Sequence, residues 1–123
     1  MTGSAACARS PVVDQVRREG DDRLACRLRV PTDDDSLRGH FPGLAIVPGM
    51  MVVDWAAGLA ARYFDVGPFV GMVSGKFRRP LRPGDVLDLT IEWQRGQGRL
   101  RYACHLGAIE CARGTLEFGR DTA

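Results

Sequence analysis

Apolar and polar side chains alternate along much of this chain, with the period of two that is typical of half-buried β-strands. In residues 24–30 every second side chain is apolar, namely Leu24, Cys26, Leu28 and Val30. Residues 12–18 lie before this segment, across a Glu-Gly-Asp-Asp turn, and are its expected hairpin partner. The first thirty residues therefore predict two antiparallel strands.

The same alternation returns in the second half of the chain. Turn-forming glycines and prolines separate four strand-like segments, which are residues 69–79, 86–93, 99–106 and 108–118. Two of them have clear apolar faces, made by Leu87, Leu89, Ile91 and Trp93 and by Leu100, Tyr102, Cys104 and Leu106. The pattern predicts four further strands in one long sheet.

One segment breaks the alternation. Residues 49–61 carry a single charge, the carboxylate of Asp54, and are apolar on every side. Such a segment predicts a helix that is buried all round. We expect this helix to open at Pro48 and Gly49 and to run to about Tyr63, before Gly67 and Pro68 end it.

Six strands bury a wholly apolar helix only if an antiparallel sheet curls around it. The expected fold is therefore α+β, with one curled sheet around one central helix, in a single domain over residues 11–123 that follows a flexible N-terminus at residues 1–10. One sheet edge and one flank of the helix stay exposed in such a unit, which predicts a homodimer.

Composition excludes several classes of function. The chain has 123 residues, 45% of them hydrophobic, which suits one domain with a real core. Its 17 Lys and Arg against 15 Asp and Glu give a net charge of +2, which favours neither nucleic acid nor an anionic membrane as partner. We expect a cytoplasmic protein, because no signal peptide or spanning segment is visible.

The four cysteines, Cys7, Cys26, Cys104 and Cys111, form no C-x-x-C pair, and neither histidine stands at a metal-ligand spacing from them. We expect buried, reduced thiols and no metal.

Asp54 needs an explanation, because an unpaired carboxylate inside an apolar helix costs several kcal/mol unless it is protonated, paired or used. The helix follows a loop that reads Gly39-His40-Phe41-Pro42-Gly43. His40 is thus a candidate for chemistry shared with Asp54.

The stretch Gly39-His40-Phe41-Pro42-Gly43-Leu44-Ala45-Ile46-Val47-Pro48-Gly49-Met50-Met51-Val52-Val53-Asp54-Trp55-Ala56 resembles the active-site signature of the hotdog-fold 3-hydroxyacyl-acyl carrier protein dehydratases. In that family a histidine in G-H-F-P lies fourteen positions before a catalytic Glu or Asp, as His40 lies before Asp54. A second stretch, Lys76-Phe77-Arg78-Arg79-Pro80-Leu81-Arg82-Pro83-Gly84-Asp85, resembles the strand-turn-strand that follows the helix in the family. The sequence around Asp54 looks most like the dehydratases of aryl-polyene and related pathways.

The resemblance implies dehydration of 3-hydroxyacyl chains to trans-2-enoyl chains in fatty-acid or polyene biosynthesis. The reaction needs a base at the carbon next to the thioester, an acid for the departing hydroxyl and a donor for the enolate-like oxygen. Neutral His40 suits the base, Asp54 suits the acid if burial raises its pKa, and the N–H of Gly49 suits the oxyanion donor at the helix start. No cofactor is implied beyond the phosphopantetheine of the carrier protein.

The family also implies a site that is shared across the homodimer, with His40 of one subunit facing Asp54 of the other. The candidate substrate-binding residues are Phe41, Pro48, Met50, Trp55 and Gly58. The candidate surface for the acyl carrier protein is a basic rim made by Lys76, Arg78, Arg79 and Arg82, for which a solvated strand face is the plain alternative.

Two departures from the family keep other functions open. A Gln is common four residues after the carboxylate, where this chain has Gly58, and Ala45 replaces a common proline. Aspartate in place of glutamate resembles the branch that also isomerises the new double bond. A hotdog acyl thioesterase, with Asp54 activating water, and a non-catalytic partner subunit that binds acyl carrier protein are the alternative functions.

Overall fold

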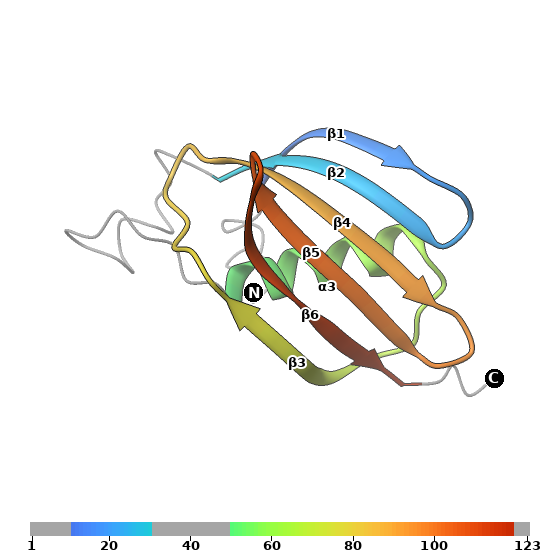
Figure 1. Ribbon diagram of the computed structural model, residues 1–123. Helices are drawn as coiled ribbons and strands as arrows, with labels where there is room; N and C mark the ends of the chain where they lie inside the picture. Colours follow the sequence, from blue (N-terminus) through green and yellow to red (C-terminus); the bar gives the residue numbers. More distant parts are fainter. Residues whose placement is uncertain (1–10, 31–49, 120–123) are drawn as a thin grey trace, which may run out of the picture.

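The computed structural model of the chain describes residues 11–30 and 50–119. Two strands come first, β1 (Val12–Arg18) and β2 (Arg23–Arg29). One helix, α3 (Met50–Tyr63), precedes the remaining strands, which are β3 (Phe69–Phe77), β4 (Val86–Gln94), β5 (Arg99–Leu106) and β6 (Ile109–Phe118). Each predicted element within the described ranges is therefore present, in the predicted order (Figure 1).

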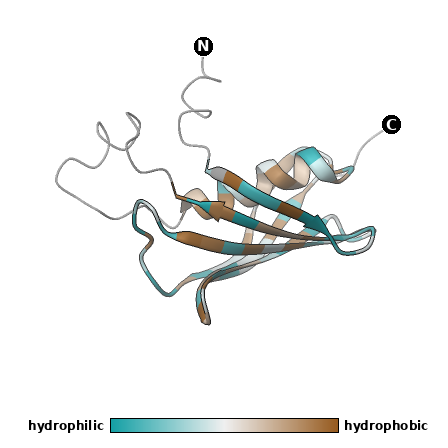
Figure 2. Ribbon diagram, turned by 90° about the horizontal axis from the view of Figure 1, so that it is seen from above, coloured by the Kyte–Doolittle hydropathy of each residue, from teal (hydrophilic) through white to brown (hydrophobic). Residues whose placement is uncertain are grey.

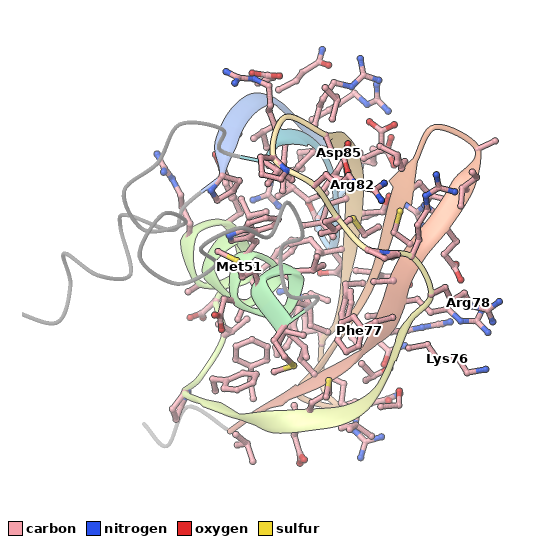
Figure 3. All side chains as sticks on the ribbon, turned by 90° about the vertical axis from the view of Figure 1, so that its left-hand side faces the viewer. Met51, Lys76, Phe77, Arg78, Arg82 and Asp85 are labelled. Carbon is pink, nitrogen blue, oxygen red and sulfur yellow. The ribbon has the colours of Figure 1, made fainter. Side chains whose placement is uncertain are left out.

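The six strands form one antiparallel sheet in the order β1-β2-β4-β5-β6-β3. The sheet curves around α3, and β1 and β3 are its two edges (Figures 1 and 3). The helix packs against the central strands β4, β5 and β6. This is the curled sheet around one helix that the apolar pattern predicted, and β1 and β2 are the predicted hairpin.

The core lies between the concave face of the sheet and α3, and apolar side chains of both make it up. Figure 2 shows α3 on one side of the curved sheet, with hydrophobic positions along both. Alternate residues of the sheet point into it, as predicted: Leu24, Leu28, Leu87, Ile91 and Leu100 have no exposed surface. From the helix, Val52, Ala56 and Ala60 are completely buried at the spacing of one turn. The alternation in the sequence thus predicted which side chains of these strands form the core.

The boundary of β3 differs from the sequence prediction. The strand ends at Phe77 and not at residue 79. The backbone N–H groups of Arg78 and Arg79 both donate to the carbonyl of Cys111, at 2.7 and 3.3 Å, so the regular ladder stops there. Leu81 then turns back into the core, where it is 2% exposed.

A turn at residues 82–85 joins the end of β3 to β4 and fastens β2. Gly84 has a φ of 89°, which a glycine adopts without strain. The carboxylate of Asp85 accepts from the N–H of Arg82 at 2.8 Å, and the N–H of Asp85 donates to the carbonyl of Arg82 at 3.0 Å. The backbone of the turn also exchanges two bonds of 2.9 Å with Val30, so the turn is fixed to the end of β2.

Candidate functional site

One face of α3 is not covered by the sheet. The exposed residues of the helix are spaced by about one turn and form what we call the free face, made by Met50, Asp54, Gly58, Ala61 and Arg62. The prediction that the helix is buried all round is therefore wrong for the single chain. The reason is geometric: the helix meets only the inner surface of a curved sheet, which leaves its opposite side bare.

Asp54 lies on the free face and is exposed. The expectation that its apolar neighbours bury the carboxylate is wrong for the single chain, because Val53 and Trp55 point into the core while Asp54 points away from it. Gly58, one turn later, is also exposed, and a Cβ built there meets no atom within 4 Å. The carboxylate thus stands beside open space on the helix surface.

The other predicted site residues divide into three groups. Met50, the first residue of α3, is 51% exposed on the free face with Asp54, whereas Trp55 is 6% exposed and belongs to the core. The predicted base His40 and donor Gly49 lie outside the described residues, as do Phe41 and Pro48. The described part of the site is therefore Asp54 with Met50 and Gly58 around it.

The edge strand β3 exposes a run of large apolar side chains. We call this surface the β3 apolar edge, made by Phe69, Val70, Met72, Val73 and Phe77, which are 42–61% exposed. β3 has no buried residue, and α3 packs mainly against β4, β5 and β6. An exposed apolar edge of this length is typical of an interaction surface.

The predicted basic rim lies at one end of the sheet, at the end of β3. Figure 3 shows Lys76 and Arg78 on the outer side of the sheet and Phe77 between them on the side of α3. The register pairs Lys76 with Arg113 of β6, two like charges. The carboxylate of Glu110 lies 3.8 Å from Nε of Arg78 and 3.6 Å from Nε of Arg113, which relieves this repulsion.

Arg79 and Arg82 are exposed beyond the strand end. Figure 3 places Arg82 beside Asp85, at the turn that fastens β2, and away from Lys76 and Arg78. The four predicted residues therefore follow one connection of the fold without forming one tight cluster. Sequence analysis missed Arg113, because only the strand register brings it beside Lys76.

A second feature that the sequence did not reveal is the hydroxyl of Tyr102. Its side chain is 3% exposed, and the hydroxyl finds no hydrogen-bond partner within residues 11–30 and 50–119. Burial raises the pKa of Tyr102, and neighbouring Cys104 adds to the effect, so the hydroxyl keeps its proton. An unsatisfied buried hydroxyl of this kind costs about 1–3 kcal/mol.

The three described cysteines are buried and free, as predicted for Cys26, Cys104 and Cys111, and Cys7 lies outside the described residues. Burial raises the pKa of Cys26 to about 11 and that of Cys104 to about 12. These thiols stay protonated near neutral pH and are poor nucleophiles. No helix in the described ranges is long and apolar enough to span a membrane, and no cluster of metal-ligating side chains occurs in them.

Comparison with known families gives one match that spans most of the fold. The sequence model of the ApeI-like family, described as ApeI dehydratase, matches residues 16–115. This range runs from β1 to β6 and contains both of the motifs that we identified in the sequence. Asp54 lies within it, together with the basic rim.

Curated relatives and solved structures agree with this match. The 3-hydroxyacyl-[acyl-carrier-protein] dehydratase FabZ of Cereibacter sphaeroides is 34% identical over 100 residues, which are 72% of this chain and 64% of that protein. FabZ of Pelotomaculum thermopropionicum is 29% identical over 87% of this chain and 85% of its own length. The dehydratase heterocomplex ApeI:P from Xenorhabdus doucetiae has a TM-score of 0.83 at 26% identity, covering 90% of this chain and 99% of that one.

Proposed function

Because this chain belongs to the ApeI-like dehydratase family, we propose that it removes water from 3-hydroxyacyl chains carried on an acyl carrier protein and produces trans-2-enoyl chains, in fatty-acid or polyene biosynthesis. The observation that carries the proposal is Asp54: it is the one carboxylate of α3, and it stands exposed on the free face of the helix in the region that the family match covers.

In the proposed reaction His40 takes the proton from the carbon next to the thioester. The electron pair forms the new double bond, and the hydroxyl leaves from the next carbon as water with a proton from Asp54. The N–H of Gly49 donates to the thioester oxygen while charge builds up there. Phe41, Pro48, Met50 and Gly58 surround the substrate, whereas the predicted substrate contact Trp55 is part of the core. The substrate needs no cofactor beyond its own phosphopantetheine arm.

Asp54 must lose its contact with water to act as an acid near neutral pH. The free face of α3 is exposed, so residues 11–30 and 50–119 do not supply this desolvation by themselves. We infer that a second subunit does. The β3 apolar edge is an exposed apolar surface of the kind that a subunit interface covers, and the free face exposes Met50 beside Asp54.

We propose a homodimer in which the β3 apolar edges of two copies meet and His40 of one copy faces Asp54 of the other. An edge strand satisfies its free backbone groups by pairing with another strand, which favours β3 over the helix alone as the centre of the interface. The Xenorhabdus relative forms a complex of two different chains, so a different partner subunit is the competing arrangement.

The basic rim of Lys76, Arg78, Arg79 and Arg82 is the proposed docking surface for the acyl carrier protein. Carrier proteins of this kind present acidic surfaces and a phosphate, which arginines bind well. The side chains are exposed at the end of β3, and Arg78 is only weakly paired with Glu110 at 3.8 Å. We place the reaction in the cytoplasm, where such carrier proteins are found.

One incubation tests the proposal against both alternatives. Purified protein is mixed with a 3-hydroxyacyl thioester of an acyl carrier protein, and the products are separated by mass. Dehydration gives a carrier-bound enoyl chain that is lighter by one water, a thioesterase releases the free acid, and a non-catalytic subunit gives neither. Failure to form the enoyl product, with the protein folded and dimeric, overturns the proposal.

A further inference from the structure

The side chain of Tyr102 lies along a row of two glycines. The register pairs Tyr102 of β5 with Gly114 of β6, and Gly114 with Gly75 of β3. A Cβ built on Gly114 falls 2.7 Å from the Tyr102 hydroxyl and 2.9 Å from the ring carbon that bears it. The ring therefore occupies the space that a side chain at position 114 would take, and it extends from β5 across β6 towards the sheet edge.

The tip of the ring reaches the β3 apolar edge. A Cβ on Gly75 falls 3.4 Å from the Tyr102 hydroxyl and 2.7 Å from Sδ of Met72. Met72 is itself 43% exposed. The hydroxyl thus lies over Gly75 together with a flexible thioether that is open to the surface, at the border between the core and the edge strand.

A phenylalanine at position 102 would fill the same space and leave no polar atom behind. The neighbours of Tyr102 along β5 are Leu100 and Cys104, both buried and apolar. The carbonyl of Ser74 also lies near Gly114 but does not accept a hydrogen bond from the hydroxyl. A buried hydroxyl with apolar neighbours needs a hydrogen-bond partner, which here must come from outside the described residues. A saturated alkyl chain that lies there provides none, whereas a chain with a hydrogen-bond acceptor does.

Resting on the proposed function, we propose that Tyr102 is a specificity-determining residue whose hydroxyl donates a hydrogen bond to an acceptor in the acyl chain, an oxygen atom or the π face of a conjugated double bond. The acyl chain lies along the inner side of β3, where Met72 moves aside for it. The site then selects acyl chains that carry such an acceptor over saturated chains of equal length.

The test compares wild type with Tyr102→Phe. The probes are three pantetheine amides, which do not react: one with a saturated chain, one with conjugated double bonds in its distal half and one with an ether oxygen there. We expect wild type to bind at least one acceptor-bearing amide roughly 2- to 12-fold more tightly than the saturated one, which is the value of one net hydrogen bond. Tyr102→Phe loses that preference and keeps its affinity for the saturated chain.

Tyr63→Phe is the matched control, because Tyr63 is the other tyrosine of the chain and lies at the end of α3 beside Arg62. It keeps the wild-type preference. Equal affinities for all three amides in wild type, or an equal loss for all three in Tyr102→Phe, overturn the inference. The inference is also overturned if weaker dimerisation is the single measurable defect of Tyr102→Phe, because the hydroxyl then stabilises the subunit interface.

The binding measurement is independent of turnover. If wild type binds the amides with the expected preference but forms no enoyl product, the proposed dehydration fails and the assignment of Tyr102 stands. If wild type forms the enoyl product without the preference, the assignment of Tyr102 fails and the proposed dehydration stands.

Discussion

Asp54 and Gly58 lie one turn apart on the free face of α3, the carboxylate exposed and the glycine without any atom within 4 Å of its missing side chain. The pair forms a charged group next to a gap in an otherwise apolar helix surface. Neither residue contributes packing within the single chain. Changes at these positions should therefore separate effects on activity from effects on folding.

Asp54→Asn should abolish dehydration and leave the fold intact. An exposed carboxylate away from caps and ion pairs contributes within about 0.5 kcal/mol to stability, whereas loss of a general acid lowers kcat by roughly 10²- to 10⁴-fold. Urea unfolding and the rate of enoyl formation measure the two quantities on the same preparation. A variant that keeps more than a tenth of the wild-type kcat contradicts the role of Asp54.

Gly58→Ala should stabilise the protein. Glycine inside a helix is up to about 1 kcal/mol less favourable than alanine, and the open space at Gly58 accepts the methyl group. Thermal unfolding should show Tm raised by roughly 2–6 °C. Gly84→Ala is the opposite control, because the φ of 89° at Gly84 strains any other residue, and it should lower Tm.

The proposal of Asp54 as a site residue rests on the sequence, whereas its environment could not be predicted from it. Fourteen residues from His40 to Asp54 and the Pro48-Gly49 pair identify the motif without coordinates. The inference from apolar neighbours to a buried carboxylate was wrong for the single chain, because neighbours in sequence point to different sides of a helix. The burial of Asp54 depends on which side of α3 the sheet covers, and the hydrophobic composition of the segment does not predict that side.

The strands also show which features the sequence predicts and which depend on the arrangement of the fold. Alternation in β4 and β5 predicted buried faces, and the structure has them. Residues 69–79 were predicted only as a strand, and the sequence did not show that β3 has no buried residue, because its place at the sheet edge is a property of strand order. The row of Tyr102, Gly114 and Gly75 likewise exists only through strand register, which places the distant strand β3 beside the β5–β6 hairpin.

Arg18→Ala should destabilise the end of α3. Nη2 of Arg18 donates to the carbonyl of Tyr63 at 2.6 Å, and the guanidinium lies 5.4 Å from the ring centroid of Phe64. Loss of this link between β1 and the last helical turn should cost about 1 kcal/mol in urea unfolding. Arg17→Ala is the control, since Arg17 bonds only the exposed Glu19 among the described residues, and it should change stability by a few tenths of a kcal/mol at most.

Arg78→Glu together with Arg79→Glu should weaken turnover of carrier-bound substrate and spare short thioester mimics. Reversal of two charges on the basic rim turns attraction for an acidic carrier protein into repulsion. The measurement is kcat/KM for both substrates, with an expected loss of about tenfold or more for the carrier-bound one at low salt. Arg27→Glu, on β2 beside Asp88, is the control for a charge reversal away from the rim. Equal losses on both substrates would reject the rim as the docking surface.

Val70→Glu should dissociate the proposed dimer. Val70 is 61% exposed in the single chain and is the most exposed residue of the β3 apolar edge, so the substitution leaves the core untouched. If two β3 strands meet, each glutamate becomes an unpaired buried charge, which costs several kcal/mol and raises the dimer Kd by roughly 100-fold or more. Sedimentation at micromolar concentration measures the shift.

Val13→Glu supplies the control at the opposite edge of the sheet, because Val13 on β1 is 47% exposed and the proposed dimer does not involve that strand. It should stay dimeric and active. The activity of monomeric Val70→Glu then shows whether the site is shared between subunits. If His40 of one subunit acts with Asp54 of the other, the rate of enoyl formation falls as the fraction of dimer falls. The rate then recovers when the protein concentration is raised. A monomer with full activity would show that one chain holds the whole site, and β3 would then be an interface without a catalytic role.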